Sequence, residues 1–94
     1  MRHHILSAQA HPDYRVDIQF VGGETAALDL AEFIATGEVT EPLRRDPGLF
    51  VTSMRVGGGG SWLAWANEVE IDADALWYQA HPEDLKRDYG TEAA

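Results

Sequence analysis

The residues with the clearest potential for chemistry are acids at every second position, followed by a histidine. The acids are Glu68, Glu70, Asp72 and Asp74, and the histidine is His81. Carboxylate oxygens and imidazole nitrogens are ligands that proteins offer to divalent metal ions. One hypothesis for this chain is therefore small-molecule or divalent-metal binding or catalysis at Glu68, Glu70, Asp72 and His81.

The spacing of these acids argues against chelation. If the stretch that ends at Asp72 is a strand, Glu68, Glu70 and Asp72 share its outer face about 7 Å apart, which is too far for two of them to bind one ion without a bend. A calcium loop that starts at Asp72 would need glycine at its sixth position, where the sequence has Trp77. The alternative is a solvated acidic edge that discourages pairing with other strands. No cofactor is expected.

Other catalytic arrangements are missing. The chain contains no cysteine, which excludes disulfides, thiolate nucleophiles and cysteine-based zinc sites. Ser7, Ser53 and Ser61 lack the sequence context of a nucleophile elbow. The glycines at 57–60 are not followed by Gly-Lys-Ser/Thr or by a helix pattern, so they predict a hairpin loop and not a phosphate cradle. No catalytic residue is predicted, and an enzyme is not expected.

The aromatic residues of the same region give a second hypothesis. Trp65 has the strand parity of Val69 and is expected in the core, whereas Trp62 has the opposite parity and faces the other side of its sheet. Trp77 and Tyr78 follow on a short helix. Exposed tryptophan and tyrosine are enriched at binding hot spots. Trp62, Trp77 and Tyr78 are therefore predicted to bind a partner, unless the short helices and the tail simply cover them.

The charge of the chain narrows the class of partner. Sixteen acids against seven Lys and Arg give a formal net charge of −9, which repels phosphate, so direct nucleic-acid binding is not expected. An acidic surface suits a basic protein partner, although acidity also serves solubility alone. There is no apolar stretch of about 18 residues, so no membrane span is expected, and the absence of cysteine is compatible with the cytoplasm. A homodimer that buries Trp62 is a further alternative.

The elements that would position these residues form one small α+β domain. The chain has 94 residues, the size of a single domain. The domain is assigned to residues 1–80, and residues 81–94 are predicted to be a polar tail that is helical and then frayed. Alternating apolar residues and the Gly22-Gly23 turn predict a three-stranded antiparallel meander. Its strands are expected at residues 5–10, 16–20 and 25–30.

The second half of the chain is predicted to add a hairpin and short helices that pack on the sheet. Strands at residues 51–56 and 62–65 form a C-terminal hairpin, and the alternation of the second strand continues to residue 71. A first helix is indicated by the spacing of Leu30, Phe33 and Ile34, which would face inward. Pro42 indicates a second helix, and Asp46-Pro47 indicates a third that carries Leu49 and Phe50. Asp72 is expected to cap a last helix that carries Leu76.

The order of these motifs resembles that of the bacterial family called domain of unknown function 2442. The resemblance covers roughly residues 5–78. Where members commonly have Trp-Pro-Asn-Gly, this chain has Trp65-Ala66-Asn67-Glu68. The quoted motifs are Phe20, Gly22-Gly23, Leu28-Asp29-Leu30, Pro42-Leu43, Asp46-Pro47, Leu49-Phe50, Trp65, Asn67, Val69, Ile71, Asp72 and Leu76.

The resemblance implies a small α+β fold and no established activity. Some relatives are encoded beside a second small protein, as in toxin–antitoxin pairs, which implies a partner encoded nearby. The sequence therefore favours a non-enzymatic protein-interaction or regulatory module, with an antitoxin-like subunit as one form of it. The acidic metal or small-molecule site stays the alternative.

Overall fold

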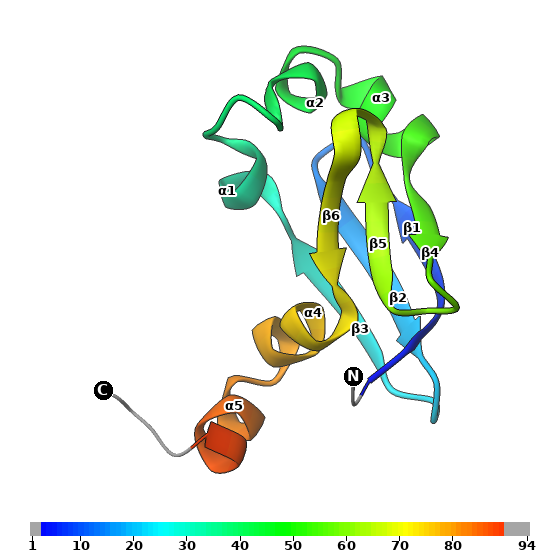
Figure 1. Cartoon of the computed structure of the whole chain (residues 1–94), viewed down its shortest axis with the longest axis vertical. Helices are drawn as coiled ribbons and strands as arrows, with labels where there is room; N and C mark the ends of the chain where they lie inside the picture. The colour runs from blue at the N-terminus through cyan, green and yellow to red at the C-terminus, as the bar shows by residue number, and fades with distance from the viewer. Residues whose placement is uncertain (1–2, 90–94) are drawn as a thin grey trace.

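The protein is built on two antiparallel sheets that pack face to face, with short helices at both ends of the pair (Figure 1). The structure is a computed structural model and describes residues 3–89. The α+β class and the N-terminal three-stranded meander predicted from the sequence are confirmed. The first sheet contains, in spatial order, β1 (Ile5–Ala10), β2 (Arg15–Phe20) and β3 (Thr25–Asp29). The second sheet contains, in spatial order, β4 (Arg55–Gly57), β5 (Trp62–Trp65) and β6 (Val69–Asp72).

Short helices occupy the two ends of the sheets. The bounds are α1 (Ala31–Ile34), α2 (Glu41–Arg45), α3 (Pro47–Ser53), α4 (Ala73–Ala80) and α5 (Pro82–Tyr89). Proline lies in the first turn of α2 and of α3, as predicted. Asp46 caps α3, because its carboxylate accepts the amide protons of Gly48 and Leu49. Asp72 stands before α4, but its side chain makes no capping hydrogen bond. Within residues 3–89, no helix combines the length and apolar character needed to cross a bilayer.

The C-terminal tail contributes the last helix. Helix α5 lies in the region that the sequence assigns to a polar, helical tail, and it contacts α4. Leu85 on this helix is exposed. The frayed end expected after the helix falls at residues 90–94, which lie outside the described part of the chain.

The second sheet departs from the prediction in its first strand. A strand was expected at residues 51–56, but α3 continues to Ser53 and β4 is only three residues long. The helix persists through its β-branched residues because Phe50 is fully buried and the Ser53 hydroxyl donates to the Leu49 carbonyl at 2.7 Å. Tertiary packing here outweighs local strand propensity.

The alternation from residue 62 to residue 71 is also not one strand. The chain reverses at the 3₁₀ turn η1 (Ala66–Glu68), and β6 returns antiparallel to β5. Trp65 lies directly opposite Val69, so the two share the inner face although the chain direction has changed. The predicted C-terminal hairpin is therefore a three-stranded sheet.

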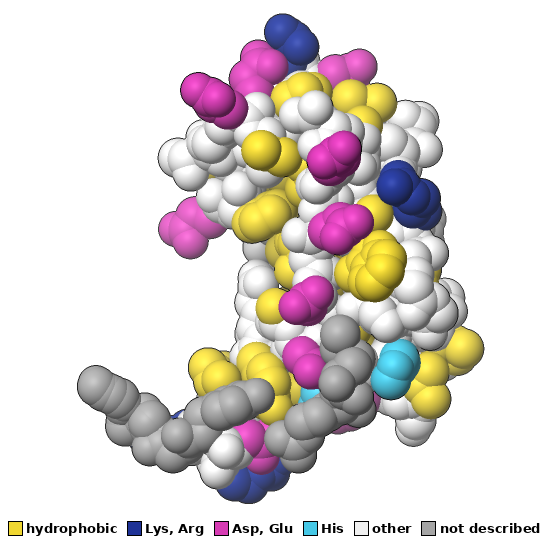
Figure 2. Space-filling model, viewed as in Figure 1, with side chains coloured by type: hydrophobic (Ala, Val, Ile, Leu, Met, Phe, Trp, Pro, Cys, Tyr) yellow, Lys and Arg dark blue, Asp and Glu magenta, His cyan; other side chains and the backbone are white. Residues whose placement is uncertain are grey.

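Among residues 3–89, no helix crosses in front of β4, β5 and β6, so none covers the outer face of this second sheet (Figure 1). Figure 2 shows the same face as a surface, with acidic side chains in a row along β6 and hydrophobic side chains on either side of the row. This face carries the residues that the sequence singles out.

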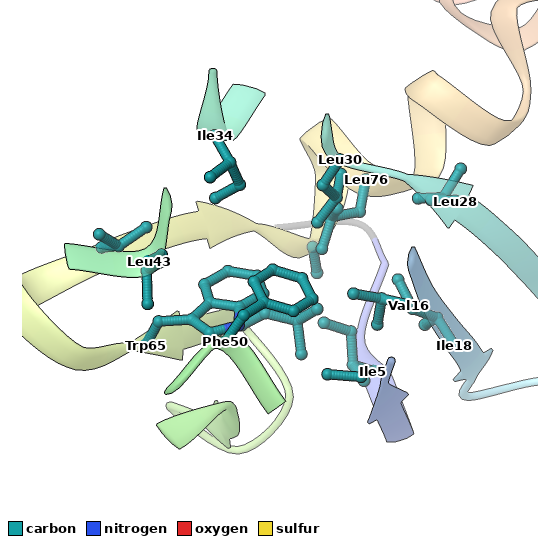
Figure 3. Packing of buried hydrophobic residues seen from close by; sticks show 14 of the residues in the cluster. Ile5, Val16, Ile18, Leu28, Leu30, Ile34, Leu43, Phe50, Trp65 and Leu76 are labelled. Carbon is teal, nitrogen blue, oxygen red and sulfur yellow. The ribbon is translucent and has the colours of Figure 1, made fainter. Parts of the chain in front are cut away.

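The core lies between the two sheets and closes on α1, α2 and α3 at one end. Trp65 and Phe50 stack at its centre, with ring centroids 5.3 Å apart (Figure 3). Phe33 was expected to face inward, but it is 43 % exposed. The four-residue helix α1 presents Ile34 to the core, and its neighbour Phe33 points outward. The labelled core residues of Figure 3 are Ile5, Val16, Ile18, Leu28, Leu30, Ile34, Leu43, Phe50, Trp65 and Leu76.

Candidate functional site

The acidic row lies along β6 and the turn before it. Glu70 and Asp72 point to the outer face of the sheet, and Glu68 precedes them in η1. Trp62 on β5 is directly opposite Asp72, so the indole and this carboxylate share the outer face. The three acids are exposed. Asp74 differs from them, because it lies in the first turn of α4 and its carboxylate accepts the backbone amide proton of His3 at 2.9 Å.

The turn that presents Glu68 has an unfavourable backbone. Asn67 and Glu68 have φ of 64° and 62°, in the left-handed region that favours glycine. Glycine is the residue that the family resemblance leads one to expect at Glu68, and the left-handed conformation costs a non-glycine residue roughly 1–2 kcal/mol. The Asn67 amide donates to the Val39 carbonyl at 2.8 Å, which ties this turn to the segment between α1 and α2. Glu68 is thus held at one end of the row.

Trp62 rests on the glycine run that precedes it. A methyl group at Gly57 would collide with the indole nitrogen of Trp62, and one at Gly58 would lie 2.5 Å from its six-membered ring. The indole therefore fills the space where side chains at both positions would be, and it is partly buried as a result. The sequence predicts a hairpin loop here but gives no sign of this contact.

Replacing Gly58 by alanine is expected to cost roughly 1–3 kcal/mol more unfolding free energy than replacing Gly59. The two glycines have similar φ, +59° and +66°, so both variants carry the same backbone strain, but only the methyl group at position 58 meets Trp62. Urea denaturation of the two variants measures the difference. Equal losses would contradict the placement of the indole.

Trp77 makes its contacts within its own chain. Its indole is stacked between His3 and His81, with ring centroids 4.1 Å and 4.0 Å away, and it makes a T-shaped contact with Phe20 at a centroid distance of 5.0 Å. The indole nitrogen donates to the Asp84 carboxylate at 3.0 Å. Trp77 therefore joins α4 to α5 and to the segment before β1.

Tyr78 is buried, with 8 % of its surface exposed. Its hydroxyl donates to the Asp88 carboxylate on α5 at 2.7 Å, and its ring makes a T-shaped contact with His3. In the described part of the chain no ring contact joins Trp62 to Trp77 or Tyr78. The three aromatic residues stay predictions as partner-binding residues, but only Trp62 lies beside the acidic row.

His81 is engaged away from the acids of β6. Its Nε2 lies 3.4 Å from the Glu24 carboxylate and its Nδ1 lies 3.0 Å from the Trp77 carbonyl. Among residues 3–89, no three His, Asp or Glu side chains are grouped so that they could hold a metal ion. The structure therefore does not bring His81 together with Glu68, Glu70 and Asp72 as a ligand set.

The structure has a groove beside β6 that was not predicted from the sequence. It runs between the start of β6 and the segment from α1 to residue 40, and two exposed apolar side chains, Phe33 and Val39, line it. The one sequence signal for an exposed apolar residue here was the pair Phe33 and Ile34, because a helix of one turn buries only one of two adjacent apolar residues. Four glutamates complete the lining: Glu32, Glu38, Glu68 and Glu70.

These features define a small α+β protein with two antiparallel sheets and an acidic, partly apolar open face. The family described as "Protein of unknown function (DUF2442)" matches residues 5–82, and the chain belongs to this family. The resemblance drawn from the order of motifs is thereby confirmed. Comparisons with curated proteins and with solved structures gave no match. The description of the family names no activity, so a function has to be argued from the site.

Proposed function

We propose that this chain is a non-enzymatic protein-interaction module that binds a basic protein partner at β6. The observation that supports this proposal is the row of Glu68, Glu70 and Asp72 beside the partly exposed Trp62, on a sheet face that no helix of the described chain covers. An aromatic ring next to charges of one sign is a common composition for a protein-binding surface.

The charge of the surface favours Lys and Arg over other partner groups. The exposed carboxylates lie within a chain of net charge −9, so a basic partner is attracted at a distance and acidic competitors are repelled. The Trp62 indole adds apolar area that an arginine side chain can stack on. Both contributions depend on residues that face solvent and that the fold does not use for its core.

A second copy of the chain is a poorer partner for this surface. Pairing of β6 with β6 would place the acidic rows of two copies against each other, and like charges opposite one another destabilise a strand pair. The same acids that discourage self-association leave the surface available to a basic protein.

Affinity capture with two charge-reversed variants tests the proposal. The double variant Glu68→Lys/Glu70→Lys is expected to retain basic proteins at least tenfold less than the wild type, since each reversal replaces attraction by repulsion. The matched control is Asp17→Lys/Glu83→Lys, which changes the net charge equally at exposed positions on β2 and α5. The control is expected to retain basic proteins like the wild type.

Two results would count against the proposal. One is equal capture by wild type and by Glu68→Lys/Glu70→Lys, and the other is equal loss in both double variants. The first would show that β6 has no role in binding, and the second would show that binding depends only on net charge.

Trp62→Ala, which keeps the charge, is expected to weaken the captured complex as well.

A further inference from the structure

The backbone of β6 leaves polar groups free at the edge of its sheet. β6 is the last strand of the order β4-β5-β6. The amide of Ala73 donates to the Ser61 carbonyl at 2.8 Å, so this pair is hydrogen-bonded. Hydrogen-bonded pairs alternate along an antiparallel ladder, so Ile71 and Val69 also bond to β5. Glu70 lies between them and therefore points both its N–H and its C=O away from β5.

No other described segment bonds to the Glu70 backbone. Backbone hydrogen bonds between segments of residues 3–89 include none that use its N–H or its C=O. The Asp72 N–H also points to the open edge, whereas its C=O stands at the N-cap position of α4. The edge thus offers unpaired donors and an acceptor, the pattern that an added strand completes.

The groove next to this edge supplies places for side chains. Phe33 and Val39 are 43 % and 53 % exposed and face the start of β6 across the groove. Among the described residues that line it there are four glutamates and no Lys or Arg. On its groove side, a segment laid along β6 would meet the exposed apolar side chains Phe33 and Val39 together with glutamates. On its outer side it would meet the carboxylates of Glu70 and Asp72.

We infer that β6 binds its partner by strand addition, taking an extended segment in which apolar residues alternate with Lys or Arg. This inference rests on the proposed function and specifies how the basic partner is held. Alternation follows from the strand period of two, which sends successive side chains to opposite faces. The edge is short, so a segment of about six residues is sufficient to span it.

The probe for the test is the synthetic peptide acetyl-Lys-Val-Arg-Val-Lys-Val-amide with the unmodified protein. Two derivatives carry one backbone N-methyl group each, on neighbouring central residues. In an added strand, one of these N–H groups points to β6 and the other points to solvent. One methylation is expected to weaken binding about tenfold and the other hardly at all.

This asymmetry is what charge attraction alone cannot produce. Equal affinities of both N-methylated peptides, or no binding of the parent peptide at millimolar concentration, would overturn the inference. Neither result touches the capture experiment with Glu68→Lys/Glu70→Lys, so failure of strand addition and failure of the proposed function are separately observable.

Protein variants test the backbone of the β6 edge and the groove beside it. Glu70→Pro removes the outward N–H, and Glu70→Gln removes the charge but keeps the N–H, so the proline variant is expected to bind the peptide at least fivefold more weakly than the glutamine variant. Phe33→Ser is expected to weaken binding severalfold, whereas Leu85→Ser changes an equally exposed residue on α5 and should not. Equal affinities within either pair would contradict strand addition beside the groove. The peptide series keeps the inference testable if Glu70→Pro fails to fold.

Discussion

Replacing Trp65 by alanine is expected to lower the free energy of unfolding by about 3–5 kcal/mol. Trp65 is fully buried and stacks on Phe50, which comes from α3, so the ring joins the second sheet to a helix at the end of the core. Its removal leaves a cavity where three helices and two sheets meet. A domain of this size has only about 5–15 kcal/mol of stability, so the variant should be close to unfolded at physiological temperature.

Thermal denaturation followed by circular dichroism measures this loss, which corresponds to roughly 15 °C or more in Tm. Trp65→Phe is the matched control. The buried Nε1 of Trp65 has no hydrogen-bond partner in the described part of the chain, so the phenylalanine variant loses volume but also removes an unpaired donor. It should be clearly more stable than Trp65→Ala. A loss below about 1 kcal/mol for Trp65→Ala would contradict the core described above.

Gly60→Ala is expected to have the second largest effect, a loss of about 2–5 kcal/mol. Gly60 has φ of +100°, and a methyl group there would lie 2.5 Å from the Ile5 carbonyl oxygen. The Gly60 carbonyl accepts the Ile5 amide proton at 2.8 Å, which connects the glycine loop to β1. The substitution therefore strains the loop and pushes the two sheets apart at the same point.

Gly59→Ala separates these two causes. Its φ is +66°, but nothing lies within 4 Å of the added methyl group, so it carries backbone strain alone. Urea denaturation should rank Gly60→Ala well below Gly59→Ala in stability. If both variants lose the same amount, the contact between Gly60 and β1 is not what this structure describes.

The first sheet could be predicted from the sequence because its signals are local. Val16, Ile18 and Phe20 alternate with polar residues and are all buried, and Gly22 and Gly23 have the positive φ that a tight turn requires. The start of α3 was predictable for the same reason, since Asp46 and its neighbours carry a complete capping signal.

The second sheet could not be predicted in the same way because long-range packing decides it. The β-branched residues before β4 join a helix that Phe50 anchors in the core. The reversal at η1 keeps Trp65 and Val69 on one face, so the alternation of residues continues through a change of chain direction. A one-dimensional pattern does not distinguish these two cases.

The candidate site also has features that local sequence signals predict and features that only long-range packing determines. The outward parity of Trp62 and the solvent exposure of Glu70 and Asp72 follow from local alternation and were predicted. The stacking of Trp77 between two histidines depends on His3, which is far away in the chain, and the groove that Phe33 lines likewise depends on distant segments. Both required the folded arrangement.

The most direct test of partner binding at β6 is a backbone amide NMR titration of the ¹⁵N-labelled chain with the peptide acetyl-Lys-Val-Arg-Val-Lys-Val-amide. Strand addition at β6 predicts that shifts concentrate on Glu68, Glu70, Asp72 and the Trp62 indole N–H, and that hydrogen exchange of the Glu70 amide becomes slower. Shifts that instead map to the outer face of β1, β2 and β3, or that spread evenly over the acidic residues of the chain, would contradict it.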